Sequence, residues 1–385
     1  MANNNDNKVL NVPHLRFPEF TEEWEEHALA EYLDFKNGLN PDVKRIGRGL
    51  PFISVMDILA DGTINYDSIR GKVEATEREI ENFSVEKGDI LFQRSSETLE
   101  DVGRANVYMD NRTAVYGGFV IRGRKIGDYN PLFFKYLLST PLARKRTCRM
   151  GAGAQHFNIG QDGLSKISLC FPLMEEQNKI ARLLSLIDER IATQNKIIDK
   201  LQSLIKGLRV CCMQRNGSDN VYLSEIAQIY QPQTISSAEL TEDGFLVYGA
   251  NGIIGKYKDY NHKTEQICIT CRGNTCGMVN YTKPMSWITG NAMVINTDKY
   301  QDKVYKKYLY HYLSAYNFNS IISGSGQPQI VRTPLEKLKI TLPTISEQKQ
   351  KAIIFDKIQD KIDINHKVLN LYIGQKQYLL RQMFI

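Results

Sequence analysis

The sequence contains no long apolar run. A membrane-spanning helix needs about 20 consecutive, mostly apolar residues, and no stretch of the 385 residues approaches that composition. Residues 1–8 form a polar start without the apolar core of a signal peptide. The seven cysteines are odd in number and irregularly spaced, which is typical of reduced thiols rather than of a disulfide framework. These absences predict a soluble, cytoplasmic protein.

A strong excess of either charge is also lacking. The formal net charge is +6 at pH 7, so any binding site for a polyanion must be a local patch. The chain is longer than one ordinary domain, and its length predicts two or three domains.

The cysteine spacing suggests a zinc site only in Cys268-x-x-Cys271 followed by Cys276. The run around Cys268 is predicted to be a strand, in which residues three apart point to opposite faces. No fourth ligand lies close in sequence, although a tetrahedral zinc site needs one. We therefore expect no metal ion and no other cofactor.

Motifs for catalysis are incomplete. Asn130-Pro131-Leu132-Phe133 lacks the second Pro of the Asn-Pro-Pro-Phe/Tyr signature of amino-methyltransferases, and a helix predicted over Pro131–Ser139 accounts for these residues. Gly252–Lys256 resembles part of a phosphate loop, but Ala250 replaces a required Gly and Tyr257 replaces the Ser/Thr that binds magnesium. The six His residues are scattered, and no Ser/His/Asp catalytic arrangement can be recognised in the sequence. We expect no catalytic residue in this chain.

The strongest feature of the sequence is a long amphipathic helix that occurs twice, over 172–214 and over 343–385. Apolar residues recur at alternating steps of three and four, a heptad pattern typical of coiled-coil packing. Each copy opens with Pro followed by Glu-Gln, and each seam has one polar break, at Gln194 and at Asn365. The seams consist of Ile180, Leu184, Ile187, Ile191, Ile198, Leu201, Ile205 and Leu208, and of Phe355, Ile358, Ile362, Leu369, Tyr372, Leu379 and Met383.

A strand-rich region precedes each long helix, and the two regions share features in the same order. Ile267–Thr270 ahead of Arg272 repeats Ile90–Gln93 ahead of Arg94, and a helical turn is expected around Trp24–Leu33. An internal duplication explains this order. The predicted fold class is α+β with a pseudo-two-fold repeat. It comprises a polar tail (1–15), a mixed α/β domain (16–171), a long helix (172–214), a similar domain (215–342) and a second long helix (343–385).

The two long helices are expected to pair antiparallel. The second domain starts where the first helix ends and finishes where the second begins, and domain termini usually lie close together. Each helix of about 38 residues would span roughly 57 Å. Antiparallel pairing about the midpoints predicts a contact between Gln194 and Asn365 that sets the helix register. The alternative is that both amides point to solvent.

The whole pattern resembles the specificity subunits of type I restriction-modification enzymes. The resemblance rests on the opening Leu15–Trp24 (LRFPEFTEEW), on Tyr248–Gly255 (YGANGIIG), on Gly-rich loops at Gly151–Ile159 and Gly324–Ile330, and on the Pro…Glu-Gln helices. It implies a non-catalytic subunit that recognises a split sequence in double-stranded DNA, one half per domain. It also implies assembly with methyltransferase and restriction subunits. Two other classes stay open: an enzyme that acts on DNA alone, and a coiled-coil scaffold without DNA binding.

Candidate DNA contacts lie in a basic run, at matched strand ends and in the Gly-rich loops. Arg at a strand end could bind guanine bidentately or a phosphate. The alternatives are a solvated helix end, a turn that caps the strand, and loops that only set the angle between domain and helix. The candidates are Arg94, Ser95, Ser96, Arg144, Lys145, Arg146, Gln155, His156 and Asn158, and in the second domain Asn251, Lys256, Arg272, Asn274, Gln327, Gln329 and Arg332.

The duplication also predicts how partners bind. Two similar surfaces related by a pseudo-dyad would bind two copies of one partner, which the resemblance implies to be the methyltransferase subunit. Outer helix faces that include Glu176, Gln177, Glu347 and Gln348 are the expected docking surfaces.

Overall fold

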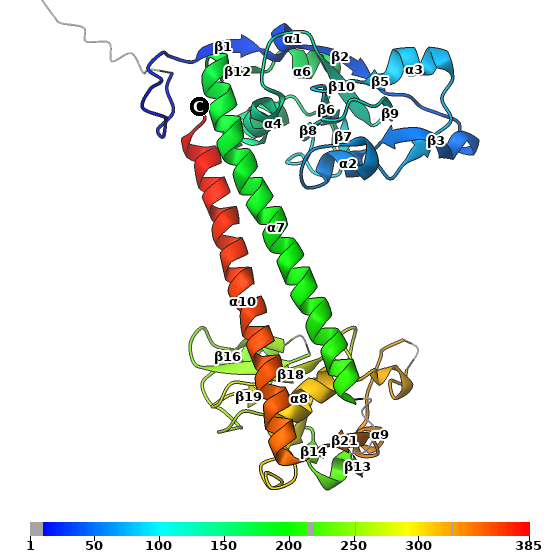
Figure 1. Cartoon of the computed structure of the whole chain (residues 1–385), viewed down its shortest axis with the longest axis vertical. Helices are drawn as coiled ribbons and strands as arrows, with labels where there is room; N and C mark the ends of the chain where they lie inside the picture. The colour runs from blue at the N-terminus through cyan, green and yellow to red at the C-terminus, as the bar shows by residue number, and fades with distance from the viewer. Residues whose placement is uncertain (1–10, 214–218, 251, 325) are drawn as a thin grey trace, which may run out of the picture. The chain divides into compact units, whose positions relative to one another are not determined.

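Two compact units make up the computed structural model, which describes residues 11–213, 219–250, 252–324 and 326–385. One unit comprises the chain up to Asn195 together with Val368–Ile385, and the other comprises Lys196–Lys367. Two long helices, α7 (Met174–Met213) and α10 (Ile345–Gln382), contribute a segment to each unit (Figure 1). They confirm the two predicted helices. No described helix combines the length and the apolar composition that a bilayer span needs.

The described part of the first unit holds two four-stranded sheets, one antiparallel and one mixed, and two further pairs of strands. Its strands are β1 (Glu25–Ala28), β2 (Leu33–Asn37), β3 (Ile46–Ile53), β4 (Lys72–Val73), β5 (Ser84–Val85), β6 (Ile90–Gln93), β7 (Ser95–Ser96), β8 (Ala105–Val107), β9 (Ala114–Tyr116), β10 (Val120–Lys125), β11 (Phe157–Asn158) and β12 (Ser168–Phe171). The antiparallel sheet has the order β2-β10-β6-β8, and the mixed sheet has the order β4-β3-β9-β5 with β3 and β9 parallel. Its short helices are α1 (Leu29–Tyr32), α2 (Val55–Leu59), α3 (Glu77–Phe83), α4 (Pro131–Ser139), α5 (Pro141–Cys148) and α6 (Gln161–Ser165).

Helix α4 has the predicted bounds, and its first residues explain the motif that resembles a methyltransferase signature. The Asn130 side-chain oxygen accepts hydrogen bonds from the backbone N–H groups of Leu132 and Phe133, both at 3.0 Å. Pro131 follows at a position where the helix needs no N–H donor. These residues therefore form a helix N-cap. The buried face of α4 then contributes Phe133 and Phe134 to the main core of the unit.

The second unit repeats the topology of the first. Its strands are β13 (Asp219–Tyr222), β14 (Gln228–Tyr230), β15 (Phe245–Gly249), β16 (Gly252–Tyr257), β17 (Ile267–Thr270), β18 (Val279–Tyr281), β19 (Trp287–Ile288), β20 (Ala292–Asn296) and β21 (Lys339–Leu342), and its short helices are α8 (Lys306–Ala315) and α9 (Arg332–Glu336). The sheet order β14-β20-β17-β18 matches β2-β10-β6-β8, and the β13–β21 pair matches β1–β12. The predicted duplication is confirmed.

Cys268 and Cys271 point to opposite sides of the second unit's sheet, as predicted. Cys268 lies in the smaller core cluster with Tyr248, and Cys271 lies in the larger one with Leu309. Among the described residues, no group of three His, Cys, Asp or Glu side chains is placed to hold a metal ion.

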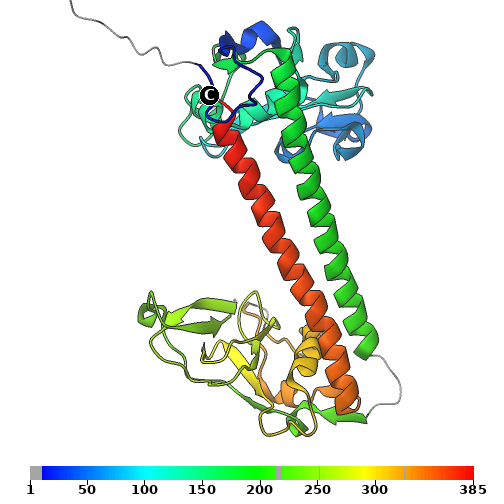
Figure 2. The same cartoon turned by 60° about the vertical axis from the view of Figure 1, so that its left-hand side comes forward.

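Within each unit, the segments of α7 and α10 run side by side in opposite directions (Figures 1 and 2). In the first unit, Asp188 pairs with Lys376 at 2.6 Å, while Arg190 donates to the Tyr372 hydroxyl at 3.3 Å. Residues further along α7 therefore contact residues earlier in α10, as antiparallel helices require. The second unit's helix segments pack through a cluster of seam residues: Leu201, Ile205, Leu208, Phe355, Ile358 and Ile362.

The polar breaks of the two seams fall in different units. Gln194 is buried in the first unit, which argues against the alternative that its amide points to solvent. Asn365, in the second unit, donates from its side-chain amide to the carbonyl of Lys361 at 2.6 Å. The predicted contact between Gln194 and Asn365 stays a prediction.

Candidate nucleic-acid interface and its supports

A buried Gln attaches each long helix to its own domain. In the first unit, the Gln177 side-chain oxygen accepts a hydrogen bond from the backbone N–H of Asn130, the N-cap of α4, at 3.0 Å. The Gln177 side-chain nitrogen donates to the carbonyl of Pro172, also at 3.0 Å. One amide thus joins α4 to the start of α7.

Gln348 makes the equivalent bonds in the second unit. Its side-chain oxygen accepts from the backbone N–H of Tyr305, the N-cap of α8, at 2.8 Å. Its side-chain nitrogen donates to the carbonyls of Pro343 and Lys303, at 2.8 and 3.1 Å. The repeated Pro…Glu-Gln motif is therefore an internal attachment that holds domain and helix together.

The expectation that the Glu-Gln residues form outer docking faces is wrong for three of the four. Gln177, Gln348 and Glu176 are at most 3% exposed, because each is bonded inside its own unit. Glu176 accepts both hydrogen bonds of the Arg16 guanidinium, at 2.8 and 2.7 Å. Glu347 is partly exposed and accepts from the backbone N–H of Thr344 at 3.1 Å, which completes the capping box at the start of α10.

A polar cluster connects the domain to both long helices in each unit. In the first unit, the Tyr136 hydroxyl on α4 donates to Asp188 on α7 at 2.8 Å, and Lys376 on α10 pairs with the same carboxylate at 2.6 Å. Burial raises the pKa of Tyr136. The hydroxyl therefore stays protonated and acts as a donor to Asp188.

The second unit has an equivalent polar cluster, which also joins a domain helix to both long helices but uses different side chains. Arg209 on α7 donates to Nδ1 of His311 on α8 at 2.8 Å, and His311 Nε2 lies 2.9 Å from Asp356 on α10. Because Arg can only donate, His311 is the neutral tautomer with its proton on Nε2. Lys307 also pairs with Asp356, at 2.6 Å.

We expect this His to make stability depend on pH. Burial lowers the pKa of His311 to about 4, from an ordinary 6.5. At a pH between those two values, His311 is protonated in the unfolded chain and neutral in the folded chain. The free energy of unfolding therefore falls as pH drops from 6.5 to 4, by about 3 kcal/mol for this group. Urea denaturation across that range measures the effect.

The matched variant for this test is His311→Gln, which keeps a donor and an acceptor but does not titrate. Its stability is expected to depend less on pH than that of the wild type between pH 6.5 and 4. Identical slopes for the two proteins would contradict the neutral, buried assignment of His311.

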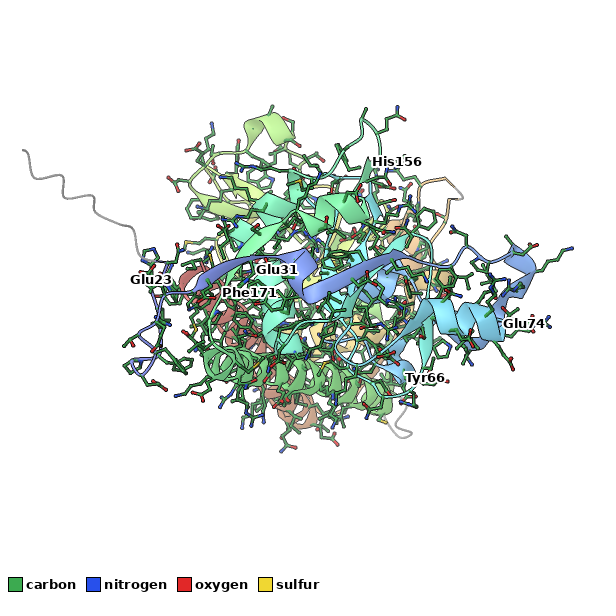
Figure 3. The ribbon with its side chains drawn as sticks, turned by 90° about the horizontal axis from the view of Figure 1, so that it is seen from above. Glu23, Glu31, Tyr66, Glu74, His156 and Phe171 are labelled. Atoms are coloured by element: carbon green, nitrogen blue, oxygen red, sulfur yellow. The ribbon has the colours of Figure 1, made fainter. Side chains whose placement is uncertain are left out.

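The structure brings together the first-domain candidates from the strand end and the Gly-rich loop. Strand β7 pairs with β11, so Ser95 lies opposite Asn158 and Ser96 opposite Phe157. The Ser95 hydroxyl donates to the Asn158 side-chain oxygen. His156 is exposed on a projecting loop, as Figure 3 shows. We call these residues, Arg94–Ser96 with Gln155–Asn158, the first recognition edge.

The second unit brings together the matched candidates. Arg272 forms a backbone bridge with Gln329, which in turn bridges Ser323 as Asn158 bridges Ala152. Arg272, Asn274 and Gln327 are exposed, and Gln329 is partly exposed. We call Arg272–Asn274 with Gln327–Gln329 the second recognition edge.

The predicted equivalence of Arg94 and Arg272 is wrong by one residue. The Arg94 carbonyl accepts from the backbone N–H of Ile159 at 3.0 Å, and the carbonyl that accepts from Ile330 at the same distance belongs to Cys271. Arg272 therefore matches Ser95. Adjacent side chains in an extended strand point to opposite faces, which explains why Arg94 is half-buried while Arg272 is exposed.

The basic run of the first domain is partly used within the domain. The Arg144 guanidinium donates to the carbonyls of Glu100 and Val102 at 2.8 and 2.6 Å, and burial lowers its pKa. Arg146 pairs with Glu26 at 2.7 Å. Lys145 is exposed, so it is the member of the run best placed to meet a phosphate.

Two further candidates in the second unit, Lys256 and Arg332, form ion pairs within that unit. Lys256 pairs with Asp243 at 3.3 Å, and Arg332 with Glu336 at 2.7 Å. Asn251 lies outside the described residues.

Sequence reasoning missed the tight turn that precedes β10, and the turn that matches it before β20. Phe119 in the first turn is 69% exposed, and Asn291 in the second is also exposed. The Phe119 carbonyl accepts from the backbone N–H of Arg94 at 2.9 Å, and the Asn291 carbonyl accepts from Cys271 at 3.0 Å. Each turn therefore lies beside a recognition edge. A Gly directly before each of these residues was the available sequence signal.

Comparison with known proteins relates this architecture to a family. A family model for the type I restriction modification DNA specificity domain matches residues 21–203 and 216–371. The chain is 25% identical over 402 residues to the putative type I restriction enzyme MjaX specificity subunit of Methanocaldococcus jannaschii, covering 94% of this chain and 92% of that protein. It is 31% identical over 140 residues to the type I restriction enzyme EcoprrI specificity subunit of Escherichia coli, covering 35% and 34%.

A solved structure shares the fold. The S subunit of a type I restriction-modification system from M. genitalium superimposes with a TM-score of 0.66 at 17% identity, covering 97% of this chain and 99% of that chain. The family model matches both halves of the chain separately. The chain therefore belongs to the type I restriction-modification DNA specificity family, with two specificity domains in tandem.

Proposed function

We propose that this chain recognises a bipartite sequence in double-stranded DNA as the specificity subunit of a type I restriction-modification complex. The observation that carries the proposal is that both units have the same backbone arrangement at the recognition edge but present different side chains there, each exposed or partly exposed. Ser95 and Asn158 occupy the positions that Arg272 and Gln329 occupy in the other unit. Side chains that differ on equivalent frames suit recognition of two different half-sites, because base edges are distinguished by their donors and acceptors.

The chain supplies recognition, and its partners supply the chemistry. Its nearest approach to a methyltransferase signature is the N-cap of α4, where Asn130 is already bonded to its own helix. Lys256, in the segment resembling a phosphate loop, lies in strand β16 rather than at a helix start. These placements support a non-catalytic subunit that depends on methyltransferase and restriction subunits. Reduced cysteines and a DNA target suit the cytoplasm.

Two methyltransferase subunits are the proposed partners of the helix pair. Apolar side chains remain exposed on both long helices, which supports docking there because large apolar side chains gain from burial. Mass measurement of the purified complex tests the stoichiometry, and saturation at one methyltransferase per chain would contradict it. The exposed side chains among the described residues are Leu186, Ile197, Leu204 and Val210 on α7, and Ile353, Ile354, Ile364, Leu371, Ile373 and Tyr378 on α10.

Methylome sequencing of a host with and without this gene tests the proposal as a whole. A split motif that is methylated only when the gene is present is the expected result, and it yields both half-sites and the gap between them. No change in methylation, with partner subunits expressed, would contradict the proposal.

Arg272→Ala is expected to relax recognition at one base pair of the second half-site. An exposed Arg that binds guanine bidentately contributes about 1–3 kcal/mol of discrimination. Binding of the complex to the target and to single-base variants measures the effect. The matched control is Lys299→Ala, which removes an exposed positive charge beyond the other end of β20. Uniform weakening across all sequences would assign Arg272 to a phosphate instead.

A further inference from the structure

Equivalent tight turns hold Phe119 and Asn291. In the first unit, the backbone N–H of Val120 donates to the carbonyl of Gly117 at 2.8 Å, which closes a four-residue turn. In the second unit, Ala292 donates to Thr289 at 2.9 Å in the same way. Phe119 and Asn291 therefore occupy the same place in the two turns.

Close backbone packing holds each turn in place. A Cβ on Gly38 would lie 2.1 Å from the carbonyl oxygen of Gly117, so only Gly lets the end of β2 approach the first turn this closely. In the second unit, a Cβ on Gly290 would lie 3.0 Å from the carbonyl oxygen of Pro232. The loop that follows the first strand of the sheet thus supports both turns. A supported turn presents its side chain with little freedom to move away from a ligand.

The chemistry at the turns differs between the two units. Phe119 exposes an aromatic ring to solvent, which costs free energy unless a partner covers it. Asn291 carries one acceptor and two donor hydrogens on its side-chain amide. An apolar group can contact the thymine methyl or a base face, whereas Asn can bind adenine through two hydrogen bonds.

We infer that Phe119 and Asn291 are base-contacting residues at equivalent positions of the two half-sites, Phe119 making an apolar contact and Asn291 hydrogen bonds. The inference rests on the proposed function. Three observations carry it: the shared turn, the backbone bond from each turn to the strand of a recognition edge, and the exposure of both side chains.

Binding of the assembled complex with Phe119→Ala tests the inference. The target sequence is first taken from the methylome. Affinity is then measured for that target and for a DNA with only the first half-site scrambled. Loss of one base contact is expected to weaken binding to the target about tenfold and to leave binding to the scrambled DNA unchanged. Asn291→Ala is expected to show the same pattern on DNA with the second half-site scrambled.

The matched control is Ile126→Ala. Ile126 is 61% exposed and directly follows β10, whereas Phe119 directly precedes it. It is therefore an exposed apolar residue at the opposite end of the same strand. We expect it to bind both DNAs as the wild type does.

Uracil in place of thymine in the first half-site separates two forms of the contact. If the wild type then binds as weakly as Phe119→Ala, the ring contacts the thymine methyl. If the wild type keeps its affinity while the variant stays weak, the ring contacts a base face. Either result supports the inference.

Three outcomes would overturn the inference. One is an unchanged preference for the target in both turn variants. Another is an equal loss of affinity on target and scrambled DNA. A third is loss of a methyltransferase subunit from the Phe119→Ala complex, measured by mass, which would make the ring a protein contact. If the wild-type complex itself shows no preference for its target, the proposed function fails rather than the inference.

Discussion

Replacing residues 16–171 with the matching segment of a relative is expected to change one half of the methylated DNA sequence and to leave the other half unchanged. The segment contains both four-stranded sheets of the first unit and the whole first recognition edge. The second recognition edge lies entirely outside it. Methylome sequencing measures the outcome, and a change in both halves would contradict independent recognition by two domains.

The exchange needs two versions, because residues outside the segment pack against it. The Phe384 ring contacts those of Trp24 and Phe133, with centroids 6.1 and 5.4 Å apart. One chimaera keeps the native residues 379–385 and the other takes the relative's, which separates a packing failure from a change of recognition. The reciprocal exchange of 215–342 is the control, and it should change only the other half.

Arg16→Ala is expected to destabilise the protein by about 3–5 kcal/mol, the range measured when one partner of a buried ion pair is removed. Glu176 is 1% exposed, and Arg16 supplies both hydrogen bonds to its carboxylate. The variant leaves that carboxylate buried without a compensating charge. Chemical denaturation of the purified protein measures the loss.

Arg332→Ala is the matched control for stability. Arg332 also pairs with a Glu, at 2.7 Å, but its side chain is 61% exposed. Loss of such a pair within one helix changes stability by about 0.3–0.5 kcal/mol. Arg16→Lys should fall between the two, because Lys keeps the charge but cannot form the two-pronged contact. Equal effects of Arg16→Ala and Arg332→Ala would contradict the role assigned to burial.

The long helices and the duplication could be predicted because their causes are local and repeated. A heptad seam places apolar residues on one helix face, whatever the rest of the chain does. Buried residues Ile180, Leu184 and Ile362 lie on the predicted seams. The pairing of Ser95 with Asn158, and of Arg272 with Gln329, joins segments that the repeat had already matched.

Features that depend on distant parts of the chain could not be predicted. The helix expected around Trp24–Leu33 is wrong over Glu25–Ala28, because that stretch pairs as β1 with Ser168–Phe171. Tertiary pairing outweighs local helix propensity there. The burial of Gln177 and Gln348 was missed for the same reason: their partners, Asn130 and Tyr305, are more than 40 residues away.

The composition of the recognition edges was only partly predictable. Sequence matching aligned Arg94 with Arg272, but backbone hydrogen bonds align Arg94 with Cys271. A single residue changes which face a strand side chain occupies, and charge alone does not distinguish an exposed Arg from one bonded inside the domain, as Arg144 is.

The hydrogen bonds by which Gln177 and Gln348 hold the domains to the long helices have a consequence for how the sequence of such a protein can evolve. Gln177 and Gln348 bind the domains through main-chain groups, the N–H of Asn130 and of Tyr305. Every residue except Pro offers that N–H, so these two bonds tolerate almost any substitution at the positions they hold. Sequence drift in a domain can therefore alter what it binds while its joint to the helix persists. Single substitutions in a domain can therefore change the DNA sequence that it recognises without changing how the domain is held to the long helices.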